Sequence, residues 1–284
     1  MTRALKSYKN GEFLASVAAR PVRILCEYEE PRHRFLEQDV RDTIVVFGSA
    51  RIVPRDVAEA RLEAAERNQR LGDGEPEKLE FALKHARKQL RLARYYEDAR
   101  ELSRRLTEWS IAQTSGRKYL VATGGGPGIM EAGNRGAADV PNGRSVGLGI
   151  SLPFEEQSNK YITPELNFEF HYFFMRKYWF IYLAKALVVF PGGFGTLDEF
   201  SEVLTLRQTG KVRKAVPIVL FGTEYWSDII NFEKMAEWGT IKPEDMKLFH
   251  RTDSVDDAFE YLVNALEHGD RTGFGMLPVP AGHL

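Results

Sequence analysis

Short apolar runs alternate along this chain with segments whose apolar residues recur at helical spacing. The runs rich in β-branched and aliphatic residues lie at 43–47, 119–123, 145–150, 186–190 and 216–221. Continuous runs of this length are typical of strands buried on both faces of a parallel sheet. The helical segments that follow are at 129 onward, 173–184, 197–209, 225–238 and 254–267. The alternation predicts an α/β fold, a parallel sheet with helices on both faces.

The regions around this core have a different character. Residues 1–42 are charged and contain Pro21 and Pro31, which predicts an N-terminal arm of short helices. Residues 56–110 predict two helices, broken by the glycines and proline at 72–76. Their Arg, Lys and Glu faces favour a solvated surface over a nucleic-acid-binding one. We expect one main domain at 43–270, with 56–110 as a helical elaboration, and a C-terminal tail at 271–284.

The amino-acid composition limits which kinds of partner and which cellular compartment we expect. Lys and Arg total 39 against 40 Asp and Glu, so the net charge is -1, and bulk electrostatic binding of nucleic acid is not expected. The most apolar window, 168–190, contains five charged residues or histidines, which excludes a membrane span. The lone cysteine, Cys26, excludes an intrachain disulfide and a cysteine zinc cluster. We expect a cytoplasmic protein.

Two glycine clusters directly follow predicted strands. The first reads GGGPGIME at 124–131 and the second PGGFGTLDE at 191–199. In an open α/β sheet such turns lie at the carboxyl edge, where glycine lets the backbone approach a ligand and the next helix offers free N–H groups to an anion. Neither cluster fits the dinucleotide or P-loop pattern, because Ile129, Asp198 and Asn134 stand where those patterns need glycine or lysine. Because two such clusters follow predicted strands, we favour a phosphate-binding site over the alternative that each cluster is only a tight connection between a strand and a helix.

Charged residues flank the second cluster. Thr196 and Glu199 have the spacing of a capping box, in which the glutamate only satisfies a helix terminus, and Asp198 has a similar structural explanation as a complement to the helix dipole. Arg176 and Lys177 begin a helix that feeds the 186–190 strand, so Arg176 is expected at the same sheet edge as Glu199. A cation there opposes the helix dipole, which favours a functional role over a solvated arginine.

Taken together, these residues resemble the LONELY GUY family of cytokinin riboside 5'-monophosphate phosphoribohydrolases, members of which were often labelled lysine decarboxylases. The resemblance covers about 43–225 and is carried by GGGPGIMEA at 124–132, Met175-Arg176-Lys177 and the PGGxGTxxE motif at 191–199. Gly48-Ser49 and Leu152-Pro153-Phe154-Glu155 with Asn159 also fit. The long N-terminal segment is closer to larger bacterial members, and Asp198 replaces a glutamate.

The resemblance implies a Rossmann-like fold, a homo-oligomer, and hydrolysis of the N-glycosidic bond of a nucleoside 5'-monophosphate without metal or cofactor. The catalytic pair it implies is Arg176 and Glu199. The phosphate loop it implies is Gly192, Gly193, Gly195 and Thr196. Further substrate-binding residues would be Ser49, Gly125, Gly126, Glu131, Met175, Lys177, Asp198 and Thr205.

The chemistry of the residues agrees with this reaction. Cleavage of an N-glycoside passes through a ribosyl cation, which an ionised carboxylate such as Glu199 stabilises or supplies with a positioned water. Arg176 would bind the base or the phosphate. A nucleotide-sensing module without turnover is the alternative function. A pyridoxal-phosphate decarboxylase needs a Schiff-base lysine, and no lysine here has a distinguishing context. The histidines show no metal-binding spacing, and the preferred base is left open.

Overall fold

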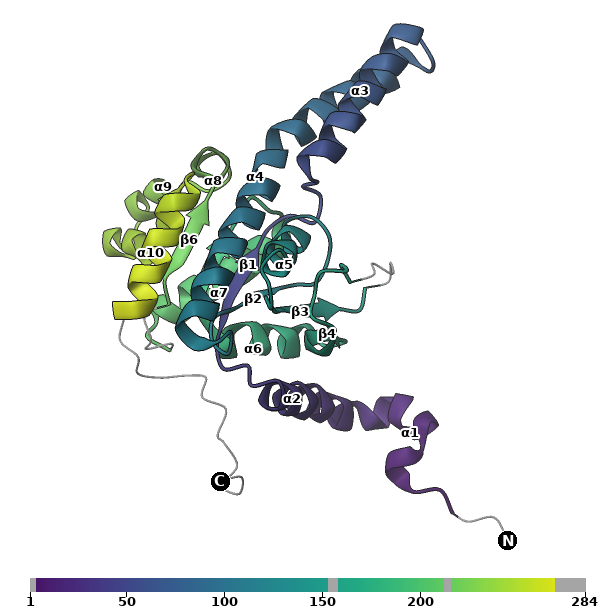
Figure 1. Ribbon diagram of the computed structural model, residues 1–284, viewed down its shortest axis with the longest axis vertical. Coiled ribbons are helices and arrows are strands. Elements are labelled where there is room, and N and C mark those ends of the chain that lie inside the picture. Colours follow the sequence, from purple (N-terminus) through teal and green to yellow (C-terminus); the bar gives the residue numbers. More distant parts are fainter. Residues whose placement is uncertain (1–3, 153–157, 212–215, 269–284) are drawn as a thin grey trace.

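A computed structural model describes residues 4–152, 158–211 and 216–268 of the chain (Figure 1). Its centre is a seven-stranded, all-parallel sheet with the strand order β4-β3-β2-β1-β5-β6-β7. The strands are β1 (Thr43–Phe47), β2 (Leu120–Thr123), β3 (Ser145–Ile150), β4 (Asn167–Phe170), β5 (Ala184–Val189), β6 (Ile218–Phe221) and β7 (His250–Thr252). The predicted α/β fold with a parallel sheet is confirmed.

Helices cover both faces of the sheet. They are α1 (Gly11–Ala15), α2 (Arg20–Glu37), α3 (Arg55–Leu71), α4 (Pro76–Thr114), α5 (Ile129–Ala138), α6 (Phe173–Leu183), α7 (Phe194–Gln208), α8 (Thr223–Ile229), α9 (Phe232–Glu237) and α10 (Val255–His268). One buried cluster joins the sheet to α2, α6 and α7, and a second joins its other face to α4, α5 and α10. The sheet therefore lies between two apolar layers, as the helices on each side in Figure 1 show.

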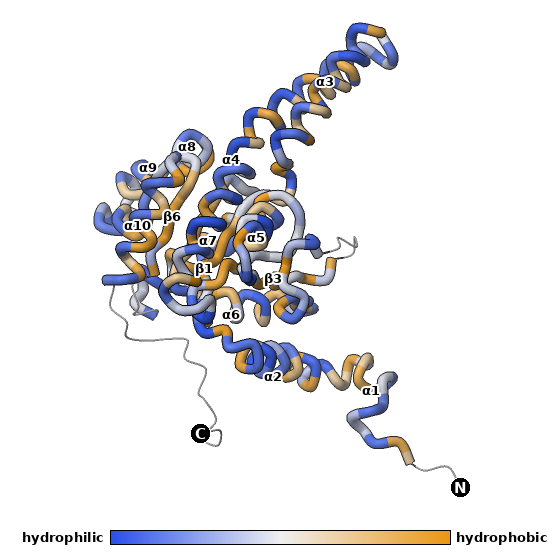
Figure 2. Tube along the Cα trace, in the orientation of Figure 1, coloured by the Kyte–Doolittle hydropathy of each residue, from blue (hydrophilic) through white to orange (hydrophobic). Residues whose placement is uncertain are grey.

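The hydrophobic pattern explains why the central strands form here. All five residues of β1 are buried, and so are all four of β2 and of β6. A strand that is buried on both faces needs apolar side chains at every position, which is why these runs do not alternate. Figure 2 shows the same contrast, with hydrophobic strands inside and helices that carry hydrophilic residues outside.

Two edge strands depart from the sequence prediction. Neither β4 nor β7 is among the strands that the sequence predicts. In β4 the two phenylalanines are buried while Glu169 is exposed, so its pattern is the alternation of an edge strand rather than a continuous run. β7 has only three residues, all of which are polar or charged. Short edge strands of this kind lack a strong apolar signal.

The expected single helix at 225–238 is wrong, because the chain forms α8 and α9 there. The Asn231 side chain accepts a hydrogen bond from the Lys234 amide and so starts α9 as its N-cap. In the N-terminal arm the sequence predicts short helices, but α2 is a single helix of 18 residues with Pro31 in its interior. Proline has no N–H to donate to the carbonyl of Glu27. The Trp179 indole of α6 donates to that carbonyl instead, at 2.9 Å.

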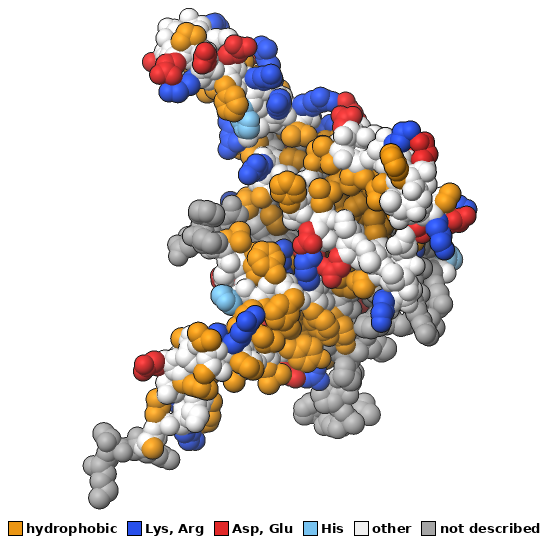
Figure 3. Space-filling model, turned by 180° about the vertical axis from the view of Figure 1, so that it is seen from behind, with side chains coloured by type: hydrophobic (Ala, Val, Ile, Leu, Met, Phe, Trp, Pro, Cys, Tyr) orange, Lys and Arg blue, Asp and Glu red, His pale blue; other side chains and the backbone are white. Residues whose placement is uncertain are grey.

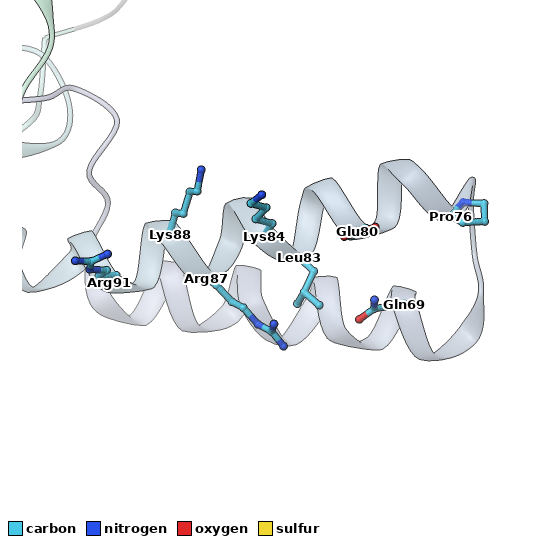
Figure 4. Close-up of a pocket in the computed structure, with 8 residues that line it drawn as sticks. All are labelled: Gln69, Pro76, Glu80, Leu83, Lys84, Arg87, Lys88 and Arg91. Carbon is cyan, nitrogen blue, oxygen red and sulfur yellow. The ribbon is translucent and has the colours of Figure 1, made fainter. Parts of the chain in front are cut away.

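The predicted pair of helices at 56–110 is an antiparallel hairpin that extends beyond the sheet (Figure 1). Gly72 ends α3 in the left-handed conformation, with φ of 64°, which glycine adopts without strain. A hollow of about 810 Å³ on this hairpin is lined by several cations, and Figure 4 shows Lys84 and Lys88 on one side of α4 and Arg87 on the other. The hollow does not include the residues predicted for the functional site.

No helix in the described part of the chain combines the length and apolar character that crossing a bilayer requires. This agrees with the charged residues in the most apolar window of the sequence. The predicted tail at 271–284 and the sequence Pro153-Phe154-Glu155 lie outside the described residues.

Candidate active site

Three strand-to-helix turns meet at the carboxyl edge of the sheet, following β1, β2 and β5. β1 lies between β2 and β5, so the chain connections diverge on its two sides, and ligands bind at such a switch point. The peptide groups of Ser49 join the two glycine turns. Its N–H donates to the Pro191 carbonyl at 2.9 Å, and its carbonyl accepts from the Ile129 N–H at 3.0 Å. The two glycine clusters therefore share one edge, as the sequence predicted.

The first glycine turn is closed by bonds within the protein. Asn159 Nδ2 donates to the carbonyls of Gly125 at 3.1 Å and Gly126 at 3.0 Å. Gly128 has φ of 71°, and a Cβ there would lie 2.3 Å from the Ser49 carbonyl oxygen. These glycines are therefore explained by a left-handed backbone and by tight packing between turns.

The second glycine turn is open. A Cβ at Gly192 would lie 2.1 Å from Thr196 Oγ1, so this glycine lets the turn fold onto its own helix. At Gly193 and Gly195, by contrast, a Cβ would meet no atom within 4 Å. α7 begins directly after Gly193 with no side-chain cap and no acidic residue in its first turn. Uncapped amide groups at a helix N-terminus are the kind of donors that suit an anion.

The capping-box interpretation of Thr196 and Glu199 is wrong. α7 starts at Phe194, so both residues lie inside the helix rather than at its N-cap and third positions. Glu199 is 2% exposed, and nothing about the helix terminus requires its carboxylate. A buried acid without a capping role needs another explanation.

Arg176 of α6 and Glu199 of α7 form a buried ion pair at this edge. Arg176 Nη2 lies 3.6 Å from Glu199 Oε1, and the two side chains are 15% and 3% exposed. The guanidinium also lies 5.4 Å from the ring centroids of Phe173 and Phe180. The structure thus brings together the two residues that the sequence placed at one edge.

Lys177 extends the pair into a charged cluster between α6 and α7, made up of Arg176, Lys177, Asp198, Glu199 and Glu202. Lys177 Nζ lies 2.7 Å from Asp198 Oδ2, 2.8 Å from Glu202 Oε2 and 3.9 Å from Glu199 Oε2. Figure 3, which views the molecule from behind, shows acidic and basic side chains meeting within a surface rich in hydrophobic side chains.

Burial shifts the pKa values of the cluster. It raises the pKa of Glu199, an effect that Lys177 and Arg176 reduce without cancelling. Burial likewise lowers the pKa of Arg176, against the attraction of Glu199. Burial alone lowers the pKa of Lys177, but hydrogen bonds to Asp198 and Glu202 bring the net pKa above its ordinary value. Glu199 therefore holds its proton to a higher pH than an exposed glutamate.

Two buried atoms of the cluster have no hydrogen-bond partner among the described residues. They are Glu199 Oε2 and Arg176 Nε. Buried polar atoms in proteins are almost always paired, and leaving one unpaired costs about 1–3 kcal/mol. The two atoms belong to the same ion pair, so the pair offers both an acceptor and a donor to a bound molecule.

Other predicted site residues lie at varying distances from this cluster. Met175 is 7% exposed and packs in the apolar core between the sheet and α6. Thr205 lies on the exposed side of α7, and its hydroxyl donates to the Ser201 carbonyl at 2.8 Å. Glu131, in the first turn of α5, accepts a hydrogen bond from the buried Tyr96 hydroxyl at 2.6 Å. Among the described residues, the side chains of these three make no hydrogen bond or ion pair with the charged cluster.

Sequence reasoning missed residues that hold the turns in place. Tyr225 Oη donates to the Gly192 carbonyl at 2.7 Å, and Thr123 Oγ1 accepts from the Gly125 amide at 3.0 Å. Asn159 was singled out only through the family resemblance. A tyrosine at the start of an expected helix and a threonine at the end of a strand carry no local signal, because each depends on which turn the fold brings near.

Groups of three or more metal-binding side chains do not occur among the residues the structure describes. The functional groups at this edge are a carboxylate, a guanidinium, an ammonium group and backbone amides. Fold and site together define an α/β protein with an uncapped helix N-terminus at the same sheet edge as a largely buried Arg–Glu pair.

Comparison with known proteins agrees with this description. The family model described as "Possible lysine decarboxylase" matches residues 130–262. A probable cytokinin riboside 5'-monophosphate phosphoribohydrolase of Oryza sativa subsp. japonica is 30% identical over 103 residues, which cover 36% of this chain and 47% of that protein. A cytokinin riboside 5'-monophosphate phosphoribohydrolase of Arabidopsis thaliana is 39% identical over 62 residues, 21% of this chain and 28% of that protein.

These matches support the resemblance carried by the motifs: over the matched residues the chain is similar to the LONELY GUY family. The matched region spans about half or less of the length of these plant relatives. The family-model match includes Arg176, Glu199 and the second glycine turn, and it begins after the glycines of the first turn.

Proposed function

We propose that this protein hydrolyses the N-glycosidic bond of a nucleoside 5'-monophosphate, AMP or a cytokinin riboside monophosphate, to release the free base and ribose 5-phosphate. The observation that carries the proposal is the buried Arg176–Glu199 pair beside the uncapped N-terminus of α7. One edge of the sheet thereby offers an anion site and a carboxylate, the two features that this reaction needs.

The phosphate group would bind at the second glycine turn. Gly193 and Gly195 leave open space there, and the helix terminus attracts negative charge. Binding of a phosphate remote from the reacting bond holds the ribose in place, so that binding energy contributes to the rate rather than to affinity alone.

Glu199 would act on the ribose. Cleavage of the bond between base and sugar builds positive charge on the anomeric carbon and the ring oxygen, and a nearby carboxylate stabilises this charge or positions the attacking water. Glu199 Oε2, the oxygen without a hydrogen-bond partner, is the atom available for either role. Its burial strengthens the interaction, because the low local dielectric weakens electrostatic forces less than water does.

Arg176 would bind the substrate and keep Glu199 ionised. Its positive charge lowers the pKa of Glu199 against the effect of burial. Its Nε–H has no partner, so the guanidinium can donate to the base or the phosphate while Nη2 stays near Glu199.

The decarboxylase named in the family model fits these residues poorly. Pyridoxal phosphate needs a lysine that becomes neutral and forms a Schiff base. Lys177 is the lysine that lies against Glu199, and its hydrogen bonds to Asp198 and Glu202 bring its pKa above the ordinary value. Such a lysine stays protonated and paired, so we derive no step through that cofactor.

Product analysis tests the proposal. The purified protein is incubated with AMP, other nucleoside 5'-monophosphates and a cytokinin riboside monophosphate, with adenosine as the matched substrate that lacks the phosphate. We expect release of free base and ribose 5-phosphate from at least one monophosphate, and much slower release from adenosine. Tight nucleotide binding without any release of base would instead support the alternative, a nucleotide-sensing module.

A further inference from the structure

The N-terminal helix α2 holds the start of α6 through one carboxylate. Glu27 Oε1 accepts a hydrogen bond from the His171 amide at 2.8 Å, and Oε2 accepts one from the Tyr172 amide at 3.2 Å. The carbonyl of Tyr172 in turn accepts from the amides of Met175 at 3.1 Å and Arg176 at 3.2 Å. A chain of hydrogen bonds therefore runs from Glu27 through the backbone of residue 172 to the backbone of Arg176.

The Glu27 carboxylate also supplies a negative charge that the first turn of α6 lacks. The N-terminal end of a helix is electropositive, and acidic residues are favourable there. α6 has no acidic residue in its first turn, while Arg176 and Lys177 place two cations near that end. Glu27 brings a negative charge to this terminus from another helix. It thereby offsets an arrangement that α6 alone would disfavour.

A second contact fixes α6 beyond Arg176. The Trp179 indole donates to the main-chain carbonyl of Glu27 at 2.9 Å, which is free because Pro31 has no amide hydrogen. Trp179 is 1% exposed, and its ring lies 5.5 Å from that of Phe35 on α2. Arg176 thus lies between two points at which α2 holds α6.

We propose that Glu27 is a positioning residue for the active site: it fixes the first turn of α6 so that the Arg176 guanidinium meets Glu199. This inference rests on the proposed phosphoribohydrolase function. Glu27 is 149 residues from Arg176 in sequence and lies before residue 130, where the family-model match begins. It acts through the backbone of α6 and does not itself belong to the charged cluster.

The experiment compares Glu27→Gln with Glu29→Gln. The first substitution keeps the size of the side chain but removes its charge and one acceptor oxygen. The second alters an exposed carboxylate of the same helix that pairs with Arg32. For each variant of the full chain, kcat and KM are measured for base release from AMP, and amide hydrogen exchange is measured in peptides that cover residues 171–177.

We expect Glu27→Gln to lower kcat/KM about 3- to 10-fold, the range that corresponds to the loss of one charge-assisted helix-terminal interaction. Exchange at residues 171–177 should become faster, and Glu29→Gln should change neither quantity. Unchanged activity, or unchanged exchange at the start of α6, would overturn the inference.

A third variant, Trp179→Phe, separates positioning from stability. It removes the hydrogen bond from the Trp179 indole to the Glu27 carbonyl and leaves the Tyr172 amide held by Glu27. We expect it to lower the melting temperature with a smaller effect on kcat than Glu27→Gln has. An equal loss of kcat at an equal loss of stability would show that Glu27 is merely structural.

Failure of the proposed function gives a different result. In that case the wild-type protein releases no base from any nucleoside monophosphate, whatever the state of residue 27. The exchange comparison then decides by itself whether Glu27 holds the first turn of α6, since that measurement needs no turnover.

Discussion

The two glycine turns have similar compositions but differ in which of their groups are already bonded. In the first turn, Asn159 bonds the carbonyls of Gly125 and Gly126, and Gly128 packs against Ser49. In the second, a Cβ at Gly193 or Gly195 would meet nothing within 4 Å. Neither α5 nor α7 has a side-chain cap, but α5 has Glu131 in its first turn whereas α7 has no acidic residue there. Glycine in the first turn thus serves the fold, whereas in the second it leaves room for a ligand. The two turns therefore differ in the space that their glycines leave open rather than in their glycine content.

The largest expected effect on activity distinguishes the glutamates that follow the two turns, Glu199 and Glu131. Glu199 follows the open turn and has an oxygen without a partner, whereas Glu131 follows the closed turn and bonds to Tyr96. We expect Glu199→Gln to lower kcat about 1,000-fold, because it removes the charge opposite the ribosyl cation. Glu131→Gln should lower kcat less than about tenfold. Steady-state kinetics on AMP measure both, and similar losses in the two variants would contradict the distinction.

The next prediction concerns stability at the closed turn. Gly128→Ala places a methyl group 2.3 Å from the Ser49 carbonyl oxygen at a residue whose φ is 71°. We expect a loss of about 3 kcal/mol in the free energy of unfolding, from steric overlap and the left-handed backbone. Urea denaturation measures the loss. A variant as stable as the wild type would show that the first turn is not packed as tightly as the structure indicates.

A smaller effect is expected at the open turn. Gly195→Ala lies in the first turn of α7, where a Cβ meets no atom within 4 Å and alanine favours the helix. The free energy of unfolding should stay the same or rise by about 0.5–1 kcal/mol. The methyl group would intrude on the anion site, so KM for AMP should rise about tenfold. An unchanged KM would place the phosphate elsewhere.

The smallest expected effect is a shift in pH dependence. Burial raises the pKa of Glu199 above its ordinary 4.5, so activity should fall on the acid side at a pH above that value. Asp198 and Glu202 contribute to the increase. Glu202→Gln should therefore move the acid limb of the kcat profile to lower pH, by less than about one unit. The second phosphate ionisation of AMP is the same for both enzymes and serves as the internal control.

The direction of the Glu199 shift also has a consequence for stability. Because its pKa is higher in the folded protein, the folded state binds the proton more tightly than the unfolded chain does. The stabilising contribution of the protonated form is fully present below the ordinary pKa of 4.5 and is lost as the pH rises through the folded pKa. Glu199 thus lowers stability under the conditions in which it would be catalytically active.

Sequence reasoning reached the central sheet and the edge that Arg176 shares with Glu199, because both have local signals. The β1 and β5 runs are continuously apolar, and the chain order places the start of α6 at the edge where β5 ends. It could not decide whether Glu199 caps α7, since that depends on whether the helix starts at Gly193 or three residues later. The contact of Lys177 with three acids, and of Glu27 with the start of α6, required the packing of separate helices. β4 and β7 lacked a signal because strands at the edge are short and partly polar.

The peptide groups of Ser49 are hydrogen-bonded to both glycine turns and so connect them into one rigid unit. A displacement of the open turn would pull on the closed one through a single residue, so neither turn is free to rearrange alone. The entropy of ordering this rim is therefore lost when the chain folds, before any nucleotide arrives. The affinity of such a preorganised edge for a ligand depends on how well the ligand fits it, because the edge itself moves little on binding.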